Sequence, residues 1–207
     1  MKLSQLSSLL GAALVVSAAA FSPSAFADSA VGAGGAPNTA AAHLDFTIVI
    51  PKVLQFRVGT AAAIDNVTFN VTAAQVGTGA ALAATAGGDI GPGVVTAKVV
   101  ANAGQVSLTA ATTGALSDGA AVPSFIPWSE ISTTVANLTS VTALQAPVIP
   151  LTGTGASLNA PAPTAAGITI ADATWTYKYL NTTVPKAGTY GNTVAKNSRI
   201  TYTATQP

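Results

Sequence analysis

The sequence contains no cysteine, a single histidine and few charged residues, and each shortage excludes a kind of chemistry. Without cysteine the chain forms no disulfide and no thiolate metal site, so the fold must hold by core packing alone. His43 is the only histidine and lies beside small residues that we expect to be flexible, which leaves no basis for a Ser-His-Asp triad or a His-based metal site. We therefore expect a protein that is not an enzyme and that uses no metal and no cofactor.

Charge is both scarce and balanced along this chain. Charged residues make up 7% of it, against about a quarter of a typical globular domain. Apart from Lys2, seven basic residues stand against seven acidic ones. Nucleic acids and anionic membranes both require a concentrated basic patch, so neither is expected as a partner. A nearly uncharged surface is poorly protected against self-association, which favours another copy or a homologous subunit as the partner.

The acidic residues are dispersed, and three of the seven, Asp65, Asp89 and Asp118, stand beside glycine or asparagine. Asp89, in a Gly-Gly-Asp-Ile-Gly-Pro-Gly stretch, and Asp118, in Ser-Asp-Gly, are candidate calcium ligands, but calcium needs six or more oxygens. Aspartates in such contexts more often stabilise turns by accepting hydrogen bonds from nearby backbone N–H groups. The favoured interpretation is two turns and no metal site.

Residues 1–27 have the pattern of a secretory signal peptide. Lys2 is the only charge, an apolar run extends from Leu9 to Phe21, and Ala25-Phe26-Ala27 is a small-x-small cleavage site. The run is shorter than the roughly 20 residues of a membrane span, and no later stretch is long enough to be one. We expect export to the periplasm, and from there to the cell surface or the extracellular space.

Cleavage after Ala27 is the first testable prediction. Mass spectrometry of the exported protein should find a chain that begins at Asp28, because the small residues of the cleavage site end there. A mature form that retains Lys2 would contradict it.

The remainder divides into a flexible tail at 28–43 and one domain at 44–207. The tail is made of small residues without periodicity, whereas the domain contains short alternating segments separated by Gly, Pro and Ala loops. The expected strands cover 44–50, 53–58, 66–71, 94–101, 105–110, 131–135, 148–151, 167–170, 173–180 and 199–205. No apolar period of 3.6 residues persists for three turns. The pattern predicts an all-β protein, a single antiparallel Ig-like β-sandwich.

The bulkiest residues concentrate near the end of the chain. Trp175, Tyr177 and Tyr179 alternate with polar residues, and a second alternating stretch ends at Thr205. Turn residues between the two stretches predict a closing hairpin, as Asn102-Ala103-Gly104 does between 94–101 and 105–110. Aromatic side chains on the apolar face of a strand usually belong to a core. The alternative is a sugar-stacking platform formed with Trp128.

The segment Leu44–Ile50 is the clearest amphipathic strand. Leu44, Phe46, Ile48 and Ile50 lie on one face, and Pro51 ends the segment because proline cannot continue a ladder. Such a strand can complete its own sheet as an ordinary first strand, or it can add to the open sheet edge of a neighbouring subunit. The sequence leaves both alternatives open.

The last twenty residues carry a recognisable signature. Pro185-Lys-Ala-Gly-Thr-Tyr-Gly-Asn-Thr-Val, followed by an Ile-Thr-Tyr strand, resembles the C-terminal segment of spore-coat-U-like and archaic chaperone–usher pilin domains, and Leu44–Ile50 looks like their donor strand. The matching positions are Gly188, Tyr190, Thr193, Val194, Ile200 and Tyr202. Asn192 stands where that family usually has Asp, and the family's usual disulfide is missing.

The resemblance implies a structural role. It points to a subunit of a bacterial surface fibre or matrix, with a periplasmic chaperone and an outer-membrane usher as further partners and Leu44–Ile50 as the exchanged strand. The alternative is a secreted adhesin or carbohydrate-binding module, which would require exposed aromatic side chains around Trp128 or Trp175.

Overall fold

The computed structural model describes residues 31–35 and 37–207. The predicted signal peptide lies outside the described residues. The chain separates into two compact units, one ending at Val49 and one beginning at Ile50, so that part of the domain expected from residue 44 belongs to the first unit. Every strand that the structure describes lies in the second unit. Among the described residues, no helix has the length and hydropathy that crossing a membrane requires.

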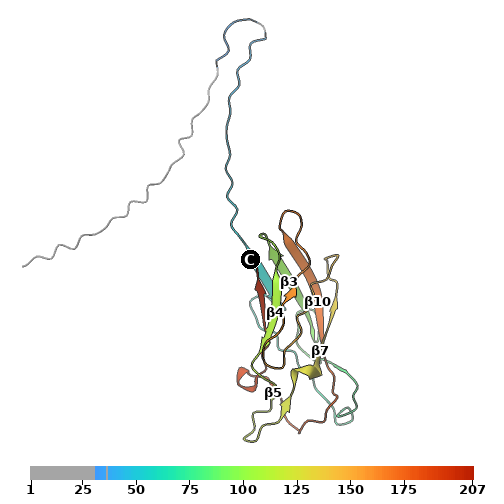
Figure 1. Ribbon diagram of the computed structural model, residues 1–207. Helices are drawn as coiled ribbons and strands as arrows, with labels where there is room; N and C mark the ends of the chain where they lie inside the picture. Colours follow the sequence, from blue (N-terminus) through green and yellow to red (C-terminus); the bar gives the residue numbers. More distant parts are fainter. Residues whose placement is uncertain (1–30, 36) are drawn as a thin grey trace, which may run out of the picture. The chain divides into compact units, whose positions relative to one another are not determined.

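The second unit is built from antiparallel strands, which confirms the predicted all-β sandwich (Figure 1). Its elements are β1 (Leu54–Val58), β2 (Leu82–Ala83), β3 (Val94–Ala101), β4 (Ser107–Thr112), β5 (Leu116–Ser117), β6 (Phe125–Ile126), β7 (Ile131–Ala136), β8 (Gly153–Thr154), β9 (Leu158–Asn159), β10 (Thr169–Tyr179), β11 (Thr201–Thr205) and the short 3-10 turns η1 (Trp128–Glu130) and η2 (Val194–Lys196).

The larger sheet is organised around β10. Residues 169–176 of β10 pair with β3, which pairs in turn with β1, and residues 174–179 pair with β7 on the opposite edge. The two residues of β2 pair with the end of β10 on the side of β3. The strand order is therefore β1-β3-β10-β7, with β1 and β7 as the outer strands. Strand β10 is the central strand, with partners on both edges, and every second residue from Thr169 to Tyr179 is buried.

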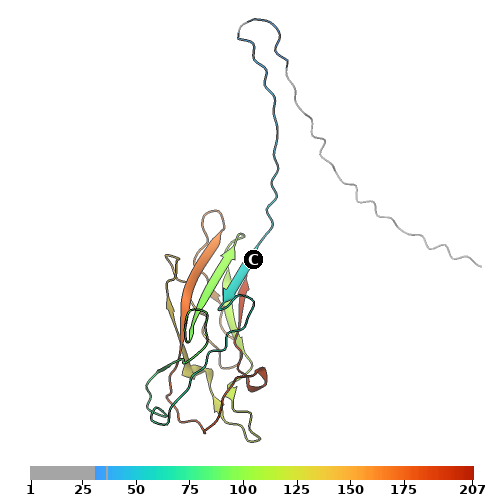
Figure 2. The same ribbon diagram turned by 180° about the vertical axis from the view of Figure 1, so that it is seen from behind.

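The smaller sheet is organised around β4. Strand β11 pairs with one edge of β4, and the short strands β8 and β9 pair with its other edge. Strands β5 and β6 form a separate antiparallel pair (Figure 2). On one side of the sandwich β1 and β11 come close together, while β7 occupies the other end of the larger sheet.

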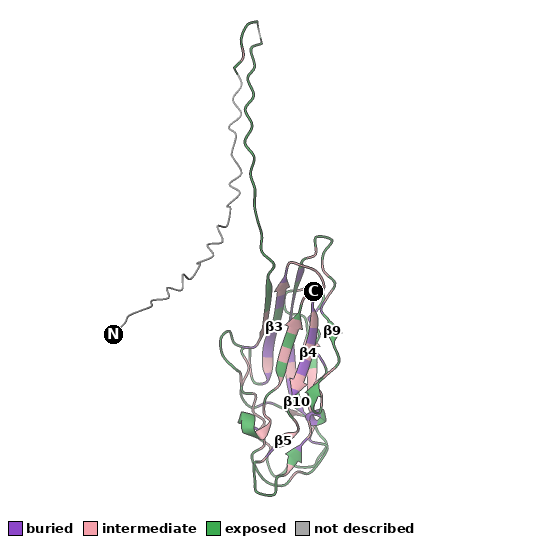
Figure 3. Cartoon of the chain, turned by 60° about the vertical axis from the view of Figure 1, so that its left-hand side comes forward, coloured by how far each residue is buried: buried purple, intermediate pink, exposed green. Residues whose placement is uncertain are grey.

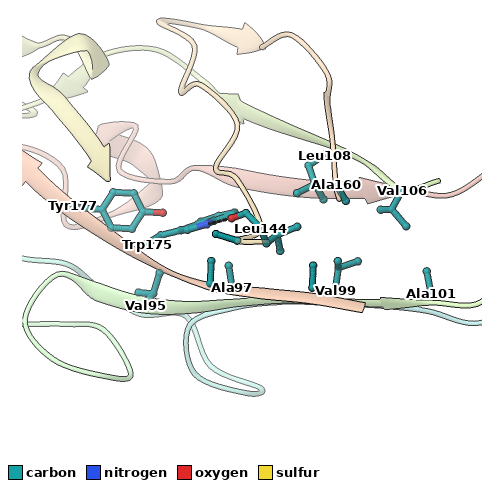
Figure 4. Packing of buried hydrophobic residues seen from close by; sticks show 13 residues of the cluster. Val95, Ala97, Val99, Ala101, Val106, Leu108, Leu144, Ala160, Trp175 and Tyr177 are labelled. Atoms are coloured by element: carbon teal, nitrogen blue, oxygen red, sulfur yellow. Dashed lines mark hydrogen bonds between the residues drawn. The ribbon is translucent and has the colours of Figure 1, made fainter. Parts of the chain in front are cut away.

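The core lies between the two sheets and is rich in alanine. Buried positions alternate along β3, β4 and β10 (Figure 3). Trp175 is completely buried, and its indole N–H donates a 2.7 Å hydrogen bond to the Leu144 carbonyl (Figure 4). Small side chains such as Ala97 and Ala173 face this region, because a large ring needs small neighbours to reach native packing density. The predicted core role of Trp175, Tyr177 and Tyr179 is confirmed, since all three are buried.

Both predicted hairpins are wrong. Strands β3 and β4 are consecutive but belong to different sheets, and so do β10 and β11. Each connection therefore crosses the sandwich instead of turning within one sheet. Period-two alternation identifies the buried face of a strand, but it does not identify the strand that pairs with it.

Two of the strands predicted after Pro51 are absent from the described part of the chain. Residues 66–71 make only one isolated bridge, between Thr68 and Ala86, although Val67 and Phe69 still pack against the core. Residues 148–151 are irregular, because Pro147 and Pro150 lack the N–H group that a ladder requires. The strands expected at 167–170 and 173–180 are instead one continuous strand, β10.

Candidate assembly site

Leu44–Ile50 does not form the first strand of the sandwich. No strand is assigned to it in the described chain, and its large side chains are among the most exposed of all (Figure 3). Leu44 is 77% exposed, Phe46 and Ile48 are each 83% exposed, and Ile50 is 76% exposed. Among the described residues the segment pairs with no strand, so both alternatives, pairing within its own chain and pairing between chains, stay predictions. The alternation places these four exposed apolar side chains at every second position of the segment.

Such a row is unusual on the surface of a protein. Single exposed apolar residues are common, but four at regular spacing on one segment mark an interaction site. The opposite face carries Asp45, Thr47 and Val49, so only one face is uniformly apolar. The segment has the amphipathic pattern of a β-strand but belongs to no sheet among the described residues.

The sandwich has unpaired strand edges that could receive such a segment. On one side lie the outer edges of β1 and β11, and on the other lie the outer edges of β7 and of the short strands β8 and β9. None of the backbone hydrogen bonds among the described residues joins these edges to a further strand. Unpaired edges are ready templates for adding a strand from another chain.

The C-terminal motif that resembles the pilin domains consists of one core residue, Tyr202, and a surface turn. Tyr202 packs against Trp175 with ring centroids 5.2 Å apart, and its hydroxyl lies 2.9 Å from that of Tyr177. Burial raises the pKa of Tyr177 to about 12 and also raises the pKa of Tyr202, so both hydroxyls stay neutral and hydrogen-bonded.

The other motif residues lie outside the core. Gly188 lies beside Asp118, and the Tyr190 hydroxyl donates to the Lys186 carbonyl. Thr193 precedes the turn η2, Val194 is 52% exposed, and Ile200 is half-buried just before β11. The motif therefore shapes the approach to β11 and does not assemble a binding pocket.

The proposed sugar-stacking platform is not formed. Trp128 is buried, and its indole N–H donates to the Gly114 carbonyl at 2.7 Å. Trp175, Tyr177 and Tyr179 are buried in the core, and Trp128, although buried, lines a cleft beside β7. The Tyr179 hydroxyl is buried without a hydrogen-bond partner among the described residues, and burial raises its pKa.

The aspartates of the predicted turns accept hydrogen bonds from backbone N–H groups, as expected. Asp89 accepts a hydrogen bond from the Thr96 N–H. Asp118 accepts from the N–H groups of Ala120 and Ser124, and these bonds hold its pKa below the usual value. Within the described residues, no group of three or more potential ligand side chains could hold a metal ion.

Two buried carboxylates were not singled out from the sequence. Asp172, on β10, accepts hydrogen bonds from the Thr139 hydroxyl and from the N–H groups of Thr139 and Ser140. Glu130 accepts from the N–H and the hydroxyl of Thr182. Each ties a loop to a strand or turn, and neither faces a cavity. An acidic residue flanked by two alanines, between two predicted strands, is the only signal that could have indicated Asp172.

An apolar cleft beside β7 was also missed by sequence reasoning. It has a volume of about 620 Å³ and lies between β7 and the irregular segment 145–151. Its apolar lining consists of Trp128, Ile131, Val135, Ala146, Pro147, Val148, Ile149 and Leu151, and no charged side chain lines it. A second hollow of about 300 Å³ shares Ala146 and Val148 with it. The cleft lies between two nearby segments, 128–135 and 145–151, and the local pattern of neither segment shows that the two line one hollow.

Comparisons of this chain with protein-family models, with curated proteins and with solved structures found no match.

Proposed function

We propose that this protein is a non-enzymatic, exported structural subunit of a bacterial surface fibre or matrix, and that it assembles by adding Leu44–Ile50 as a strand to the open sheet edge of a neighbouring subunit. The observation that carries the proposal is the exposed apolar row of Leu44, Phe46, Ile48 and Ile50. The sandwich of each copy offers unpaired strand edges that such an amphipathic segment can extend.

The energetics of strand addition support this role. At about 25 cal/mol per Å² of apolar surface, burying four such side chains contributes on the order of 6 to 12 kcal/mol before ordering costs. Adding a strand also satisfies the backbone groups of the edge that receives it. The low charge of the surface imposes little repulsion between copies.

The carbohydrate-binding alternative lacks its main requirement. It needs exposed rings around Trp128 or Trp175, and both side chains are buried. A periplasmic chaperone and an outer-membrane usher remain part of the proposal, because an apolar strand and open edges need protection during export.

The test is to place charges on the apolar face of the segment. The double variant Phe46→Asp plus Ile48→Asp should fold normally, because both side chains are exposed in the isolated chain. It should no longer assemble, because two carboxylates would have to be buried without partners. Gel filtration of the exported protein should show monomers in place of a ladder of oligomers, and added peptide covering 44–50 should cap wild-type subunits.

The matched control is Thr47→Asp plus Val49→Asp, which adds the same charge to the other face of the same segment. This variant should still assemble. If both double variants assemble, or if the wild-type protein is a monomer that never binds the peptide, Leu44–Ile50 does not mediate assembly.

A further inference from the structure

The unpaired edges of the sandwich differ in what surrounds them. Beside β11, the Lys52 ammonium donates to the Pro207 carbonyl and ties the start of β1 to the end of the chain. Tyr202, an inward-facing residue of β11, already has the Trp175 ring and the Tyr177 hydroxyl as partners. These contacts involve a residue before β1 and the inner face of β11, and neither strand lines the clefts at residues 145–151.

The edge of β7 has the opposite character. All the hydrogen bonds of β7 within the sheet go to β10, so its outer N–H and C=O groups have no strand partner among the described residues. The sequence Ile-Ser-Thr-Thr-Val-Ala contains no charge and no proline, the usual devices that protect an edge from pairing. The apolar cleft of about 620 Å³ runs beside it.

The walls of the cleft are exposed as well as apolar. Val148 is 80% exposed and Leu151 is 60% exposed, although both face the half-buried Ile131 and Val135 across the cleft. An irregular segment containing two prolines cannot pair with β7 itself, so the edge and the apolar wall stay open together. An extended strand with one apolar face and one polar face fits this combination.

We propose that the cleft between β7 and residues 145–151 is the acceptor site for Leu44–Ile50 of a second copy, so that the added strand extends the larger sheet beyond β7. This inference rests on the proposed function, because it names the edge at which strand addition takes place. Leu44, Phe46, Ile48 and Ile50 face the apolar wall, and Asp45, Thr47 and Val49 face solvent. The apolar face of the donor strand is complementary to the uncharged cleft, so this contact buries no charged side chain.

Chain length requires the strand to come from another copy. Ile50 is four residues before Leu54, where β1 begins, and four residues span at most about 14 Å. The position outside β7 is four strand spacings from β1, or about 19 Å. Ile50 therefore cannot lie beside the β7 of its own chain while β1 keeps its place. An acceptor at β7 makes the contact head-to-tail, and such contacts propagate into fibres unless they close into a ring.

Cysteine cross-linking tests the assignment cleanly, because the chain contains no cysteine of its own. A full-length donor carrying Thr47→Cys is mixed with differently tagged acceptors that carry one cysteine each on the exposed face of an edge strand. The acceptors are Thr134→Cys on β7 and Thr203→Cys on β11, both replacing exposed threonines. Because strand pairing fixes the register, Ser132→Cys and Ala136→Cys on β7 and Thr201→Cys and Thr205→Cys on β11 complete the two series.

Under the proposal, reducible donor–acceptor dimers form with the β7 series and not with the β11 series. Dimers confined to the β11 series would overturn the assignment while leaving strand addition intact. If neither series gives dimers and the wild-type protein stays monomeric in gel filtration, the proposed function itself fails.

A matched pair of surface variants provides a second readout. Val148→Asp places a carboxylate in the cleft wall, whereas Val141→Asp replaces a 96% exposed valine outside the cleft. Both should fold, because neither side chain is buried. Binding of a labelled 44–50 peptide should weaken about tenfold or more in Val148→Asp, since the charge would be desolvated without a partner, and should be unchanged in Val141→Asp. Equal binding to both variants would exclude the cleft.

Discussion

Replacing Trp175 with alanine is expected to leave little folded protein. The side chain is completely buried at the centre of the core, and truncating a large buried aromatic costs about 3 to 5 kcal/mol. The total stability of a domain is only about 5 to 15 kcal/mol, and this chain has no disulfide to compensate. The variant also leaves the Leu144 carbonyl without its indole donor.

Denaturant unfolding followed by circular dichroism measures this loss. Trp175→Phe keeps most of the ring volume but removes the hydrogen bond, so it should cost less, about 1 to 3 kcal/mol. Phe125→Ala truncates an aromatic that is 52% exposed and should change stability least of the three. A Trp175→Ala variant as stable as Phe125→Ala would show that the two sheets do not pack around this ring.

The second large effect is expected at Asp172 and should depend on pH. Hydrogen bonds from the Thr139 hydroxyl, and then from the N–H groups of Thr139 and Ser140, lower the pKa of Asp172 from 3.8 to about 2, against an opposing effect of burial. Because the pKa is lower in the folded state, the ionised carboxylate stabilises the fold fully above about pH 4. This contribution is lost as the pH falls toward 2.

Asp172→Asn should therefore destabilise the protein by about 1 to 3 kcal/mol at pH 7, as expected for hydrogen bonds to a charged acceptor. The difference from wild type should shrink between pH 4 and pH 2, where the wild-type carboxylate also becomes neutral. Denaturant unfolding at pH 7 and at pH 2.5 measures both quantities. Asp45→Asn, in the exposed segment, is the control and should match wild type at both values. A difference that does not vary with pH would assign the effect to packing instead of charge.

The buried face of β10 followed from the sequence. Trp175, Tyr177 and Tyr179 alternate with polar residues, and all three are buried. Alternation is a local property, because successive side chains of a strand point to opposite faces. For the same reason the turn roles of Asp89 and Asp118 could be predicted from the glycines beside them.

Strand pairing did not follow from the sequence. Turn residues after Ala101 and after Tyr179 predicted hairpins, but each connection crosses to the other sheet. Whether a strand turns back or crosses depends on which pairing buries more apolar surface across the whole sandwich. That comparison includes residues far apart in the chain, so turn chemistry alone cannot decide it.

The two parts of the candidate site, the segment Leu44–Ile50 and the cleft beside β7, also differ in how far the sequence predicts them. The sequence by itself determined the amphipathic row of Leu44–Ile50, the absence of cysteine and the scarcity of charge, because these are properties of single residues and their spacing. Only the tertiary structure decided that the outer edge of β7 has no strand partner among the described residues and that residues 145–151 line a cleft beside it. Exposure and clefts depend on what the rest of the chain leaves unfilled, and that is fixed only when the sheets have packed.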